Sequence, residues 1–392
     1  FPHQNDENQW LLNYSAALYV EDSTGVVVRN CRVWHGQTAL CLDRADEARV
    51  YDNDFSFNSA WGIAMWRSSR CVVSRNACDF CIRGYSDGAY NRGQDSAGIL
   101  MFEQCCDNVI AENSATHGGD AFFGYSGREA RGEAAEDDPA KVQEILAQKL
   151  GCNRNLLVRN DFSYAAAHGI EMTFSFGNRY LANRLVGNAI CGVWGGYSQD
   201  TLIAKNEIAE NGPLGYGLER GGINIDTSRH NRIIGNEFRA NPCGVHLWWA
   251  AENRYRPWID AHCPDYEGNV IADNTFTADE LAWHFRGPGA VTLARNTLRD
   301  VKQTEQIDGD VQVVRDDSLP AEDVAIPAYP VFGETRPVGA RAALRGRQNI
   351  IMTEWGPWDH VSPLVREIEN TGATRTYVIE CVKHVKATSK GG

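Results

Sequence analysis

Asn recurs along the chain directly after short, mostly β-branched apolar runs. Five of the nine intervals between successive members are 22 or 23 residues, and the longer intervals fit the same unit with insertions. A fixed period of this length is the signature of a repeat architecture. The members are Asn30, Asn53, Asn76, Asn113, Asn160, Asn183, Asn206, Asn236, Asn274 and Asn296.

A unit of this length is too short for a strand followed by a long helix, but it fits one circuit of three short strands joined by turns. Stacked circuits form a parallel β-helix, in which each repeat buries its inner face only against its neighbours. Asn suits the turns because it tolerates left-handed backbone and forms local hydrogen bonds. Stacked Asn side chains can also bond to one another. The sequence therefore predicts an all-β parallel β-helix of about ten rungs.

A second repeat with the same period consists of five-residue segments that begin with Gly or Ala. Their second and fourth residues are mostly large and apolar, whereas the third and fifth vary. Because side chains alternate across a strand, the first set faces the core and the second faces outward. The segments are 39–43, 62–66, 98–102, 121–125, 169–173, 192–196, 222–226, 244–248 and 282–286. We interpret their outward column as the floor of a functional site.

Four insertions interrupt the period, at about 82–95, 126–150, 211–217 and 249–266. They fall on both sides of the strand column, so we expect them to form the walls of a cleft. The 126–150 insertion predicts one helix, with Asp138 as N-cap, Pro139 at the first helical position and Gly151 after its end.

The repeat ends near residue 303, which predicts three regions. Residues 1–303 form the β-helix, 304–345 a linker or extended wrap, and 346–392 a small β module or the start of one, with a strand at 375–380. The chain begins at Phe1 without an initiator Met, and we interpret it as a processed or trimmed form.

The formal net charge of −13 argues against nucleic acid as a partner. No apolar run is long enough to span a membrane. The twelve cysteines indicate either an oxidising compartment with some disulfides or small apolar residues in stacked interiors. Their spacing predicts no metal site, and no cofactor is expected.

The outward positions change character at the fifth segment. Earlier segments are largely apolar or aromatic, including Tyr125, whereas later ones combine carboxylates and His with Trp. Such a mixture suits a sugar site, since aromatic rings stack on pyranose faces and acids act at the glycosidic bond; the alternative is a solvated polar sheet face. The later outward residues include Glu171, Trp194, Asn224, Asp226, His246, Trp248, His284 and Arg286.

Glu171 and Asp226 are the predicted catalytic pair. They lie two rungs apart, so their backbones are about 9.6 Å apart. This is near the separation of roughly 6.5–9.5 Å expected of an inverting glycosidase. We expect His246, His284 and Arg286 to tune the pair or to bind substrate.

Asp120 and His168 precede their strands in adjacent rungs and could form a hydrogen bond at the cleft edge, as catalytic groups or as a structural pair at a tight turn. If Asp120 turned into the cleft, it would lie one rung from Glu171, which is closer to retaining geometry. The predicted substrate contacts are Trp194, Asn224, Trp248, Arg286, Tyr125, Arg92 and Asp95, with Arg254, Tyr255, Arg256, Trp258 and His262 as further wall candidates.

Residues 24–300, through these repeats, resemble right-handed parallel β-helix repeat proteins of the pectate-lyase-like superfamily of carbohydrate-binding proteins and sugar hydrolases. The chain is also similar to a bacterial, secreted subgroup with segments such as 90–98, 116–120, 193–198 and 355–357. The resemblance implies a right-handed coil and an extracellular polysaccharide, treated by hydrolysis, β-elimination or epimerisation.

The set of catalytic sequence motifs of polygalacturonases is absent, and Asn224-Ile225-Asp226 matches only part of one of them. The calcium-binding Asp cluster of pectate lyases is not evident either. We therefore predict a secreted or periplasmic glycoside hydrolase acting on a polysaccharide. The alternatives are a polysaccharide lyase that uses His246 or His284 with Arg286, and a non-catalytic carbohydrate-binding β-helix.

Overall fold

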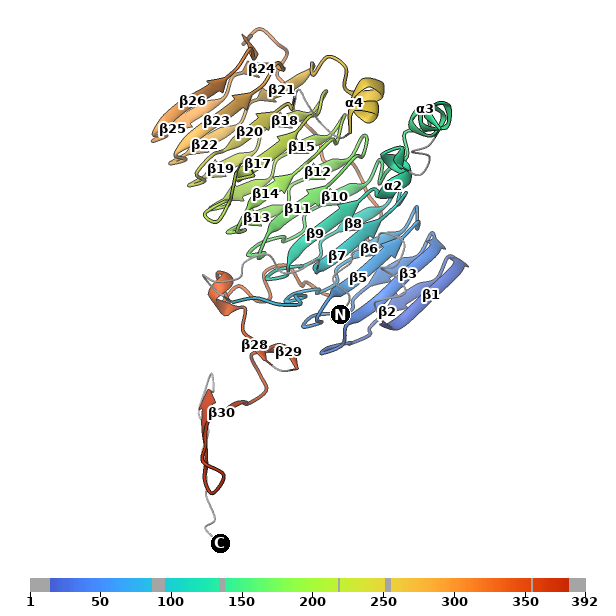
Figure 1. The fold of residues 1–392 in the computed structure, drawn as a ribbon, viewed down its shortest axis with the longest axis vertical. Helices are drawn as coiled ribbons and strands as arrows, with labels where there is room; N and C mark the ends of the chain where they lie inside the picture. Colours follow the sequence, from blue (N-terminus) through green and yellow to red (C-terminus); the bar gives the residue numbers. More distant parts are fainter. Residues whose placement is uncertain are drawn as a thin grey trace.

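The computed structural model describes residues 15–86, 96–133, 138–217, 219–250, 255–353 and 355–380. Three parallel sheets wind around one axis and form a β-helix (Figure 1). The predicted all-β fold is confirmed. The two longer sheets each have eleven strands, slightly more than the predicted number of rungs.

The strands of each sheet come from successive circuits of the chain. Sheet A contains β1 (Ala16–Thr24), β3 (Thr38–Asp46), β5 (Trp61–Trp66), β7 (Ala97–Phe102), β9 (Asp120–Tyr125), β11 (His168–Met172), β14 (Cys191–Trp194), β17 (Gly221–Asp226), β20 (Val245–Trp248), β23 (Leu281–Arg286) and β26 (Gln303–Asp308). Sheet B contains β2 (Val27–Arg29), β4 (Arg49–Tyr51), β6 (Val72–Ser74), β8 (Val109–Ala111), β10 (Leu156–Val158), β12 (Arg179–Leu181), β15 (Leu202–Ala204), β18 (Arg232–Ile234), β21 (Asn269–Ala272), β24 (Ala290–Ala294) and β27 (Gln312–Arg315). Sheet C contains β13 (Arg184–Val186), β16 (Glu207–Ala209), β19 (Glu237–Arg239), β22 (Thr275–Thr277) and β25 (Thr297–Arg299).

The Gly- or Ala-led segments form sheet A in the register that the sequence predicts. Glu171 pairs with Trp194, Trp194 with Asn224, Asn224 with His246, and His246 with His284. These outward side chains therefore form one continuous row across the sheet. The residues that precede four of them are fully buried in the core: Ile170, Val193, Ile223 and Val245.

A ladder of buried Asn side chains joins the rungs at the turn after sheet B. The Nδ2 of Asn53 donates to the Oδ1 of Asn76 at 2.9 Å, and the backbone N–H of Asn53 donates to the same oxygen at 3.2 Å. The same arrangement continues through Asn113, Asn160, Asn183, Asn206, Asn236, Asn274 and Asn296. Each amide thereby satisfies backbone groups that the turn would otherwise leave without partners.

Asn30 does not belong to this ladder, so its predicted place in the repeat is wrong by one residue. Val28 pairs with Val50, which puts Cys31 in line with Asn53. The backbone N–H of Cys31 donates to the Oδ1 of Asn53 at 2.9 Å. Asn30 instead occupies the left-handed position before the ladder, with a φ of 54°.

The predicted helix is α3 (Pro139–Ala147), which follows the short helix α2 (Gly127–Ala130). The Asp138 side chain caps α3 by accepting the backbone N–H groups of Ala140 and Lys141. Leu146 is the buried residue of this helix.

A further helix, α4 (Arg256–His262), lies in the 249–266 insertion and was missed by sequence reasoning. Figure 1 shows α2, α3 and α4 on the same side of the β-helix. Trp258 of α4 is fully buried and packs edge-on against Phe174 and Tyr197, in the turns after β11 and β14. The expectation that Trp258 contacts substrate is therefore wrong, because this ring anchors the helix.

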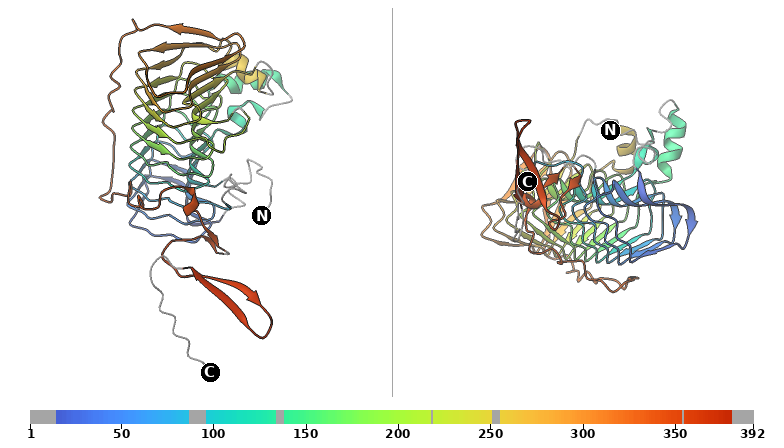
Figure 2. Two further views of the ribbon diagram at one scale, coloured as in Figure 1. Left: turned by 90° about the vertical axis from the view of Figure 1, so that its left-hand side faces the viewer. Right: turned by 90° about the horizontal axis from the view of Figure 1, so that it is seen from below.

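The coil continues beyond the predicted end at residue 303, since β26 and β27 add strands to sheets A and B. After Arg315 the chain returns along the outside of the coil, toward its N-terminal end (Figure 2). We call residues 316–346 the wrap. Its Val324 packs with outward residues of sheet B such as Leu156, Val158 and Leu181.

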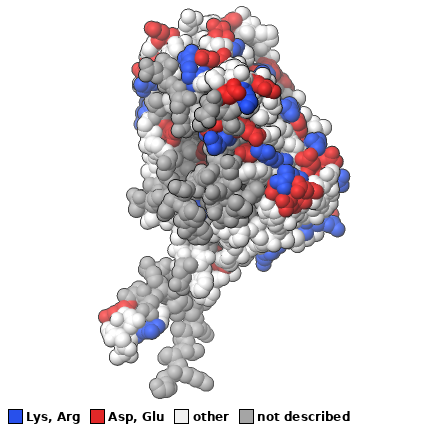
Figure 3. Space-filling view, turned by 45° about the vertical axis from the view of Figure 1, so that its right-hand side comes forward, with Lys and Arg blue, Asp and Glu red and all other residues white. Residues whose placement is uncertain are grey.

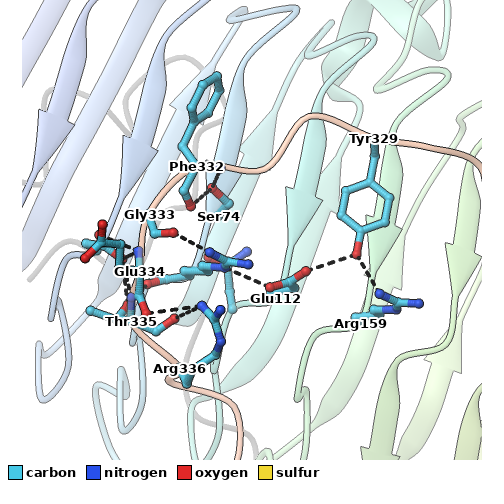
Figure 4. A network of polar contacts seen from close by, with 12 residues as sticks. Ser74, Glu112, Arg159, Tyr329, Phe332, Gly333, Glu334, Thr335 and Arg336 are labelled. Carbon is cyan, nitrogen blue, oxygen red and sulfur yellow. Dashed lines mark hydrogen bonds and ion pairs between the residues drawn. The ribbon is translucent and has the colours of Figure 1, made fainter.

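Polar contacts also hold the wrap against sheet B and its turns (Figure 4). Tyr329 donates its hydroxyl to Glu112 at 3.1 Å, and Phe332 exchanges hydrogen bonds with Ser74. The Asp52 carboxylate accepts the backbone N–H groups of Glu334 and Thr335.

The chain then forms two small antiparallel pairs at the N-terminal end of the coil. These are β28 (Met352–Thr353) with β29 (Gly356–Pro357), and β30 (Leu364–Asn370) with β31 (Arg375–Glu380). Figures 1 and 2 show the second hairpin projecting away from the β-helix.

The cysteines of the described residues are all free, and most of them are buried. The expectation of disulfides is therefore not met in this part of the chain. These cysteines pack as small apolar residues, so they carry no argument for an oxidising compartment.

We expect Asn183→Ala to lower the free energy of unfolding by about 3 kcal/mol or more. The substitution removes four ladder hydrogen bonds and leaves buried backbone groups without partners. Urea unfolding would measure the loss. Asn30→Gly is the control, since it removes an exposed amide from a left-handed position that Gly tolerates. Equal stabilities of the two variants would contradict the role of the ladder.

Candidate functional site

Three titratable side chains meet where β9 and β11 begin. His168 Nδ1 lies 3.0 Å from Asp120 Oδ1 and 3.0 Å from Glu171 Oε2, and the His168 backbone N–H donates to Asp120 Oδ1 at 2.9 Å. The expected contact between Asp120 and His168 is thus present, and Glu171 joins it. All three side chains are largely buried.

The site strongly favours the charged form of His168. Burial alone would lower its pKa, but the hydrogen bonds to Asp120 and Glu171 outweigh it and raise the pKa of His168 to about 10. Burial raises the pKa of Glu171 despite the contact with His168, and the charges of Asp120 and Glu219 add to this effect. At neutral pH, His168 is therefore an imidazolium.

Among the described residues, Asp120, His168 and Glu171 are also the group that could hold a metal ion. Their candidate ligand atoms all lie within 4.8 Å of one another. A cation here would have to displace the proton of His168 Nδ1, because a metal-bound imidazole nitrogen must be deprotonated. Metal binding at this position would therefore strengthen as pH rises.

Several buried groups on this face have no hydrogen-bond partner in the described part of the chain, and two of them lie close to each other. They are His168 Nε2 and the indole Nε1 of Trp194. The two rings lie 6.4 Å apart, centroid to centroid. Since an unsatisfied buried donor costs about 1–3 kcal/mol, a ligand that supplies hydroxyl or carboxyl oxygens would relieve both.

Asp226 lies at the far end of β17 from this cluster. It accepts a 2.6 Å hydrogen bond from Thr227 Oγ1. Burial raises the pKa of Asp226 to about 6, against the lowering effect of hydrogen bonds from Thr227 and Tyr197. Asp226 therefore stays partly protonated in a pH range where an exposed Asp is fully ionised.

The structure does not bring Glu171 and Asp226 together. Asn224 is in line with Glu171, and Asp226 lies two residues further along its strand. Two strand spacings and this offset along the strand place their Cα atoms about 12 Å apart. The predicted separation of about 9.6 Å counted the two strand spacings alone. Glu171 contacts His168, toward the start of its strand, and Asp226 contacts Thr227, beyond the end of its own. Their pairing stays a prediction that this geometry does not favour.

Glu219 and Arg220, directly before β17, are site residues that sequence reasoning missed. The Glu219 charge helps to raise the pKa of both Glu171 and Asp226, so it lies within reach of both. Arg220 Nη2 lies 3.4 Å from His284 Nδ1. The signal available in the sequence was the insertion at 211–217, which ends beside these two residues.

His246 is held in one tautomer by its neighbours. The Trp248 indole N–H donates to Asn224 Oδ1 at 3.0 Å, which turns the Asn224 Nδ2 toward His246 Nδ1, also at 3.0 Å. His246 Nδ1 is therefore the acceptor, and the proton of the neutral ring is on Nε2.

His284 stacks on His246, with ring centroids 4.4 Å apart. Its Nε2 donates to Asp308 at 2.7 Å and its Nδ1 faces Arg220. Burial lowers the pKa of His284 despite the contact with Asp308. In the neutral ring both nitrogens are engaged, which leaves no lone pair for proton abstraction.

The remaining predicted contacts lie at different places. Trp194 is half-buried in the central row, and Arg286 is exposed and pairs with Trp248 and Asp308 in the register of the sheet. Tyr125 ends an aromatic row that runs from Trp66 through Phe102. Arg92, Asp95 and Arg254 lie outside the described residues.

Comparisons with known proteins agree with this architecture. A family model for the right-handed β-helix region matches residues 7–135, and one for the periplasmic copper-binding protein NosD matches residues 147–287. The chain is a right-handed parallel β-helix protein. No curated protein sequence matches it significantly.

Several solved structures follow a similar course at low identity. They include the A-module of mannuronan C-5 epimerase AlgE6 from Azotobacter vinelandii (11% identity, 74% of this chain, 58% of that chain, TM-score 0.38), the GH136 lacto-N-biosidase from Eubacterium ramulus (10%, 76%, 62%, 0.40) and the Dettilon tailspike protein (12%, 74%, 60%, 0.40). The aligned part thus spans about three fifths of each of these structures. Similarity at this level carries no information on substrate.

No helix among the described residues has the length and apolarity needed to cross a membrane. On the face of the molecule seen in Figure 3, acidic and basic side chains are interspersed rather than gathered into a patch of one sign.

We expect His168→Gln to lower the free energy of unfolding by about 3–5 kcal/mol at pH 7, because it leaves two buried carboxylates without their cation. The raised pKa means that this contribution is complete below about pH 6.5 and is lost as pH rises through about 10. Urea unfolding between pH 6 and 10 should therefore show the difference from the wild type narrowing. His230→Gln is the control, because His230 is exposed and its partner Asp200 is half exposed. A difference that does not change with pH would contradict a charged His168.

Proposed function

We propose that this protein is a glycoside hydrolase that cleaves a polysaccharide on the outer face of sheet A. The observation that carries the proposal is the pair of unpartnered buried groups, His168 Nε2 and Trp194 Nε1, on a face that also presents carboxyls with raised pKa values. Sugar hydroxyls would satisfy both groups, and the exposed part of the Trp194 ring would stack on a pyranose. Because the expected substrate is an extracellular polysaccharide, the proposal includes a secreted or periplasmic location.

In this proposal Asp226 is the general acid and Glu219 the general base. Asp226 keeps its proton up to about pH 6, as a group that protonates a leaving oxygen requires. Glu219 acts electrostatically on Asp226, and in this proposal it is the base that activates water. Glu171, held by His168 and Asp120, would bind the substrate hydroxyls, with Asn224, Trp248 and Arg286 beside it.

A second pair is favoured by the short distance between Asp120 and Glu171, whose nearest oxygens lie within 4.8 Å of each other. Retaining glycosidases hold their carboxyl groups about 5–5.5 Å apart. The raised pKa of Glu171 would suit the acid and Asp120 the nucleophile. This pair gives the opposite stereochemistry of the product, so the configuration of the released anomeric carbon separates the two mechanisms.

A lyase reaction has less support, because it needs a basic nitrogen near the substrate. Both nitrogens of His284 are engaged, and His246 accepts from Asn224 at the nitrogen that carries its lone pair. Neither imidazole therefore offers the base that β-elimination requires.

The test is digestion of a polysaccharide panel, read for new reducing ends and for the ultraviolet absorbance of unsaturated uronates. We expect reducing ends without absorbance, at a rate that falls above about pH 6 as Asp226 loses its proton. Asp226→Asn and Glu219→Gln should each lower the rate by a factor of about 100 or more. NMR of the fresh product should show inversion.

Asp43→Asn is the matched control, because Asp43 is the outward carboxyl at the corresponding position of β3. It should keep full activity. Retention at the anomeric carbon, with activity lost in Asp120→Asn and Glu171→Gln, would move the chemistry to the second pair. Absorbance of unsaturated product would overturn hydrolysis. So would a lack of cleavage of every substrate, both by the untreated protein and by the protein treated with EDTA.

A further inference from the structure

A cavity of about 270 Å³ lies between the wrap and the β-helix. Residues 338–345 of the wrap cover it from outside, and its floor is the region where single bridging pairs, such as Asp161 with Arg184, continue sheet C toward the N-terminus. It is thus on a different face of the coil from the site on sheet A. Its size is close to the lower limit of small-molecule pockets, roughly 300 Å³.

Three guanidinium groups line this cavity, and two of them are balanced by carboxylates. Arg184 contacts both oxygens of Asp161 at 3.2 Å. Arg341 forms an ion pair with the fully buried Asp79 and stacks on Phe57.

Arg345 is the third guanidinium, and the charge of Glu210 acts on it without forming an ion pair. Arg345 is exposed, and it forms no ion pair with any carboxylate of the described residues. Its guanidinium instead donates a hydrogen bond to the Tyr164 hydroxyl. Among the described residues, Arg345 is therefore the guanidinium of this cavity with no carboxylate at ion-pair distance, whereas Arg184 and Arg341 each face two.

Tyr164 positions two of these cations. Its hydroxyl oxygen accepts from Arg184 Nη2 at 3.0 Å and also from Arg345. Because these two bonds occupy the oxygen as an acceptor, the hydroxyl proton is directed elsewhere and is available to a ligand acceptor. Guanidinium N–H groups beside it match the two oxygens of a carboxylate.

The remaining lining combines polar side chains of the coil, such as Ser114, Thr116 and His117, with apolar groups on the side of the wrap. Val338 and Ala342 of the wrap face the cavity together with the ring of Tyr164. A bare inorganic ion would leave these groups without contacts, whereas a ligand with a compact C–H surface would fill the volume.

We propose that this cavity binds a small organic carboxylate with a body up to the size of one sugar ring. The carboxylate meets Arg345 and the Tyr164 hydroxyl, and the body lies against Val338 and Ala342. A bound ligand contacts both the wrap and the coil, so it also ties residues 338–345 to the β-helix.

Isothermal titration calorimetry of the full chain with glucuronate tests the proposal, with glucose as the neutral analogue and sodium sulfate as the inorganic anion. We expect saturable binding of glucuronate and none of glucose. Arg345→Gln should weaken the binding about tenfold or more, because a charge-assisted hydrogen bond is lost. Ala342→Phe, which fills the cavity from the exposed wrap, should abolish it.

Arg336→Gln is the matched control, since Arg336 is an exposed Arg of the same wrap whose hydrogen bonds go to neighbouring carbonyls. It should bind like the wild type. No binding of glucuronate, equal binding of glucose, sulfate binding as tight as glucuronate, or binding unaffected by Arg345→Gln and Ala342→Phe would each overturn the proposal. The last outcome would assign glucuronate to another surface, such as sheet A.

Discussion

The hydrogen bond between Asn side chains of successive rungs is the interaction on which the rest of this structure depends. A β-helix turns its chain sharply at every corner, and each turn buries backbone groups that no strand can pair. An amide fits this position because it carries donors and an acceptor on one short side chain, so each Asn accepts from one rung and donates to the next. The ladder therefore stabilises the corners and also fixes how far each circuit advances.

That fixed advance turns a one-dimensional sequence into rows of side chains. Once the corners are in register, the outward residues of sheet A can only stand beside their counterparts one circuit away. Site residues of neighbouring circuits are up to 48 positions apart in the sequence, as Asp120 and His168 are, yet they meet because the scaffold leaves them no other register. A rigid scaffold of this kind can hold groups in costly environments, such as an imidazolium between two buried carboxylates.

This physical logic explains what sequence reasoning could and could not predict. The coil, the register of sheet A and the helix capped by Asp138 followed from periods and cap residues, which are local properties. Asn30 was placed wrongly because an Asn in a left-handed turn position has the same spacing, within one residue, as an Asn of the ladder. The pairing of Glu171 with Asp226 was not supported because alternation gives the face of a residue, but neither its offset along the strand nor the direction in which its side chain leans. Glu219, Arg220 and α4 lie in insertions, where no period constrains the backbone.

The wrap explains why several strands of sheet B are apolar on both faces. Strands such as Leu156–Val158 and Leu202–Ala204 are apolar at every position, although only one face of a strand can point into the coil. Continuous apolar strands are expected where both faces are covered. Val324 and Ile326 of the wrap pack on the outward side chains of sheet B, and this contact removes them from water. The apolar outer face of sheet B and the returning segment thus require each other. The cavity beneath residues 338–345 therefore lies in a part of the wrap that the contacts with sheet B already hold against the coil.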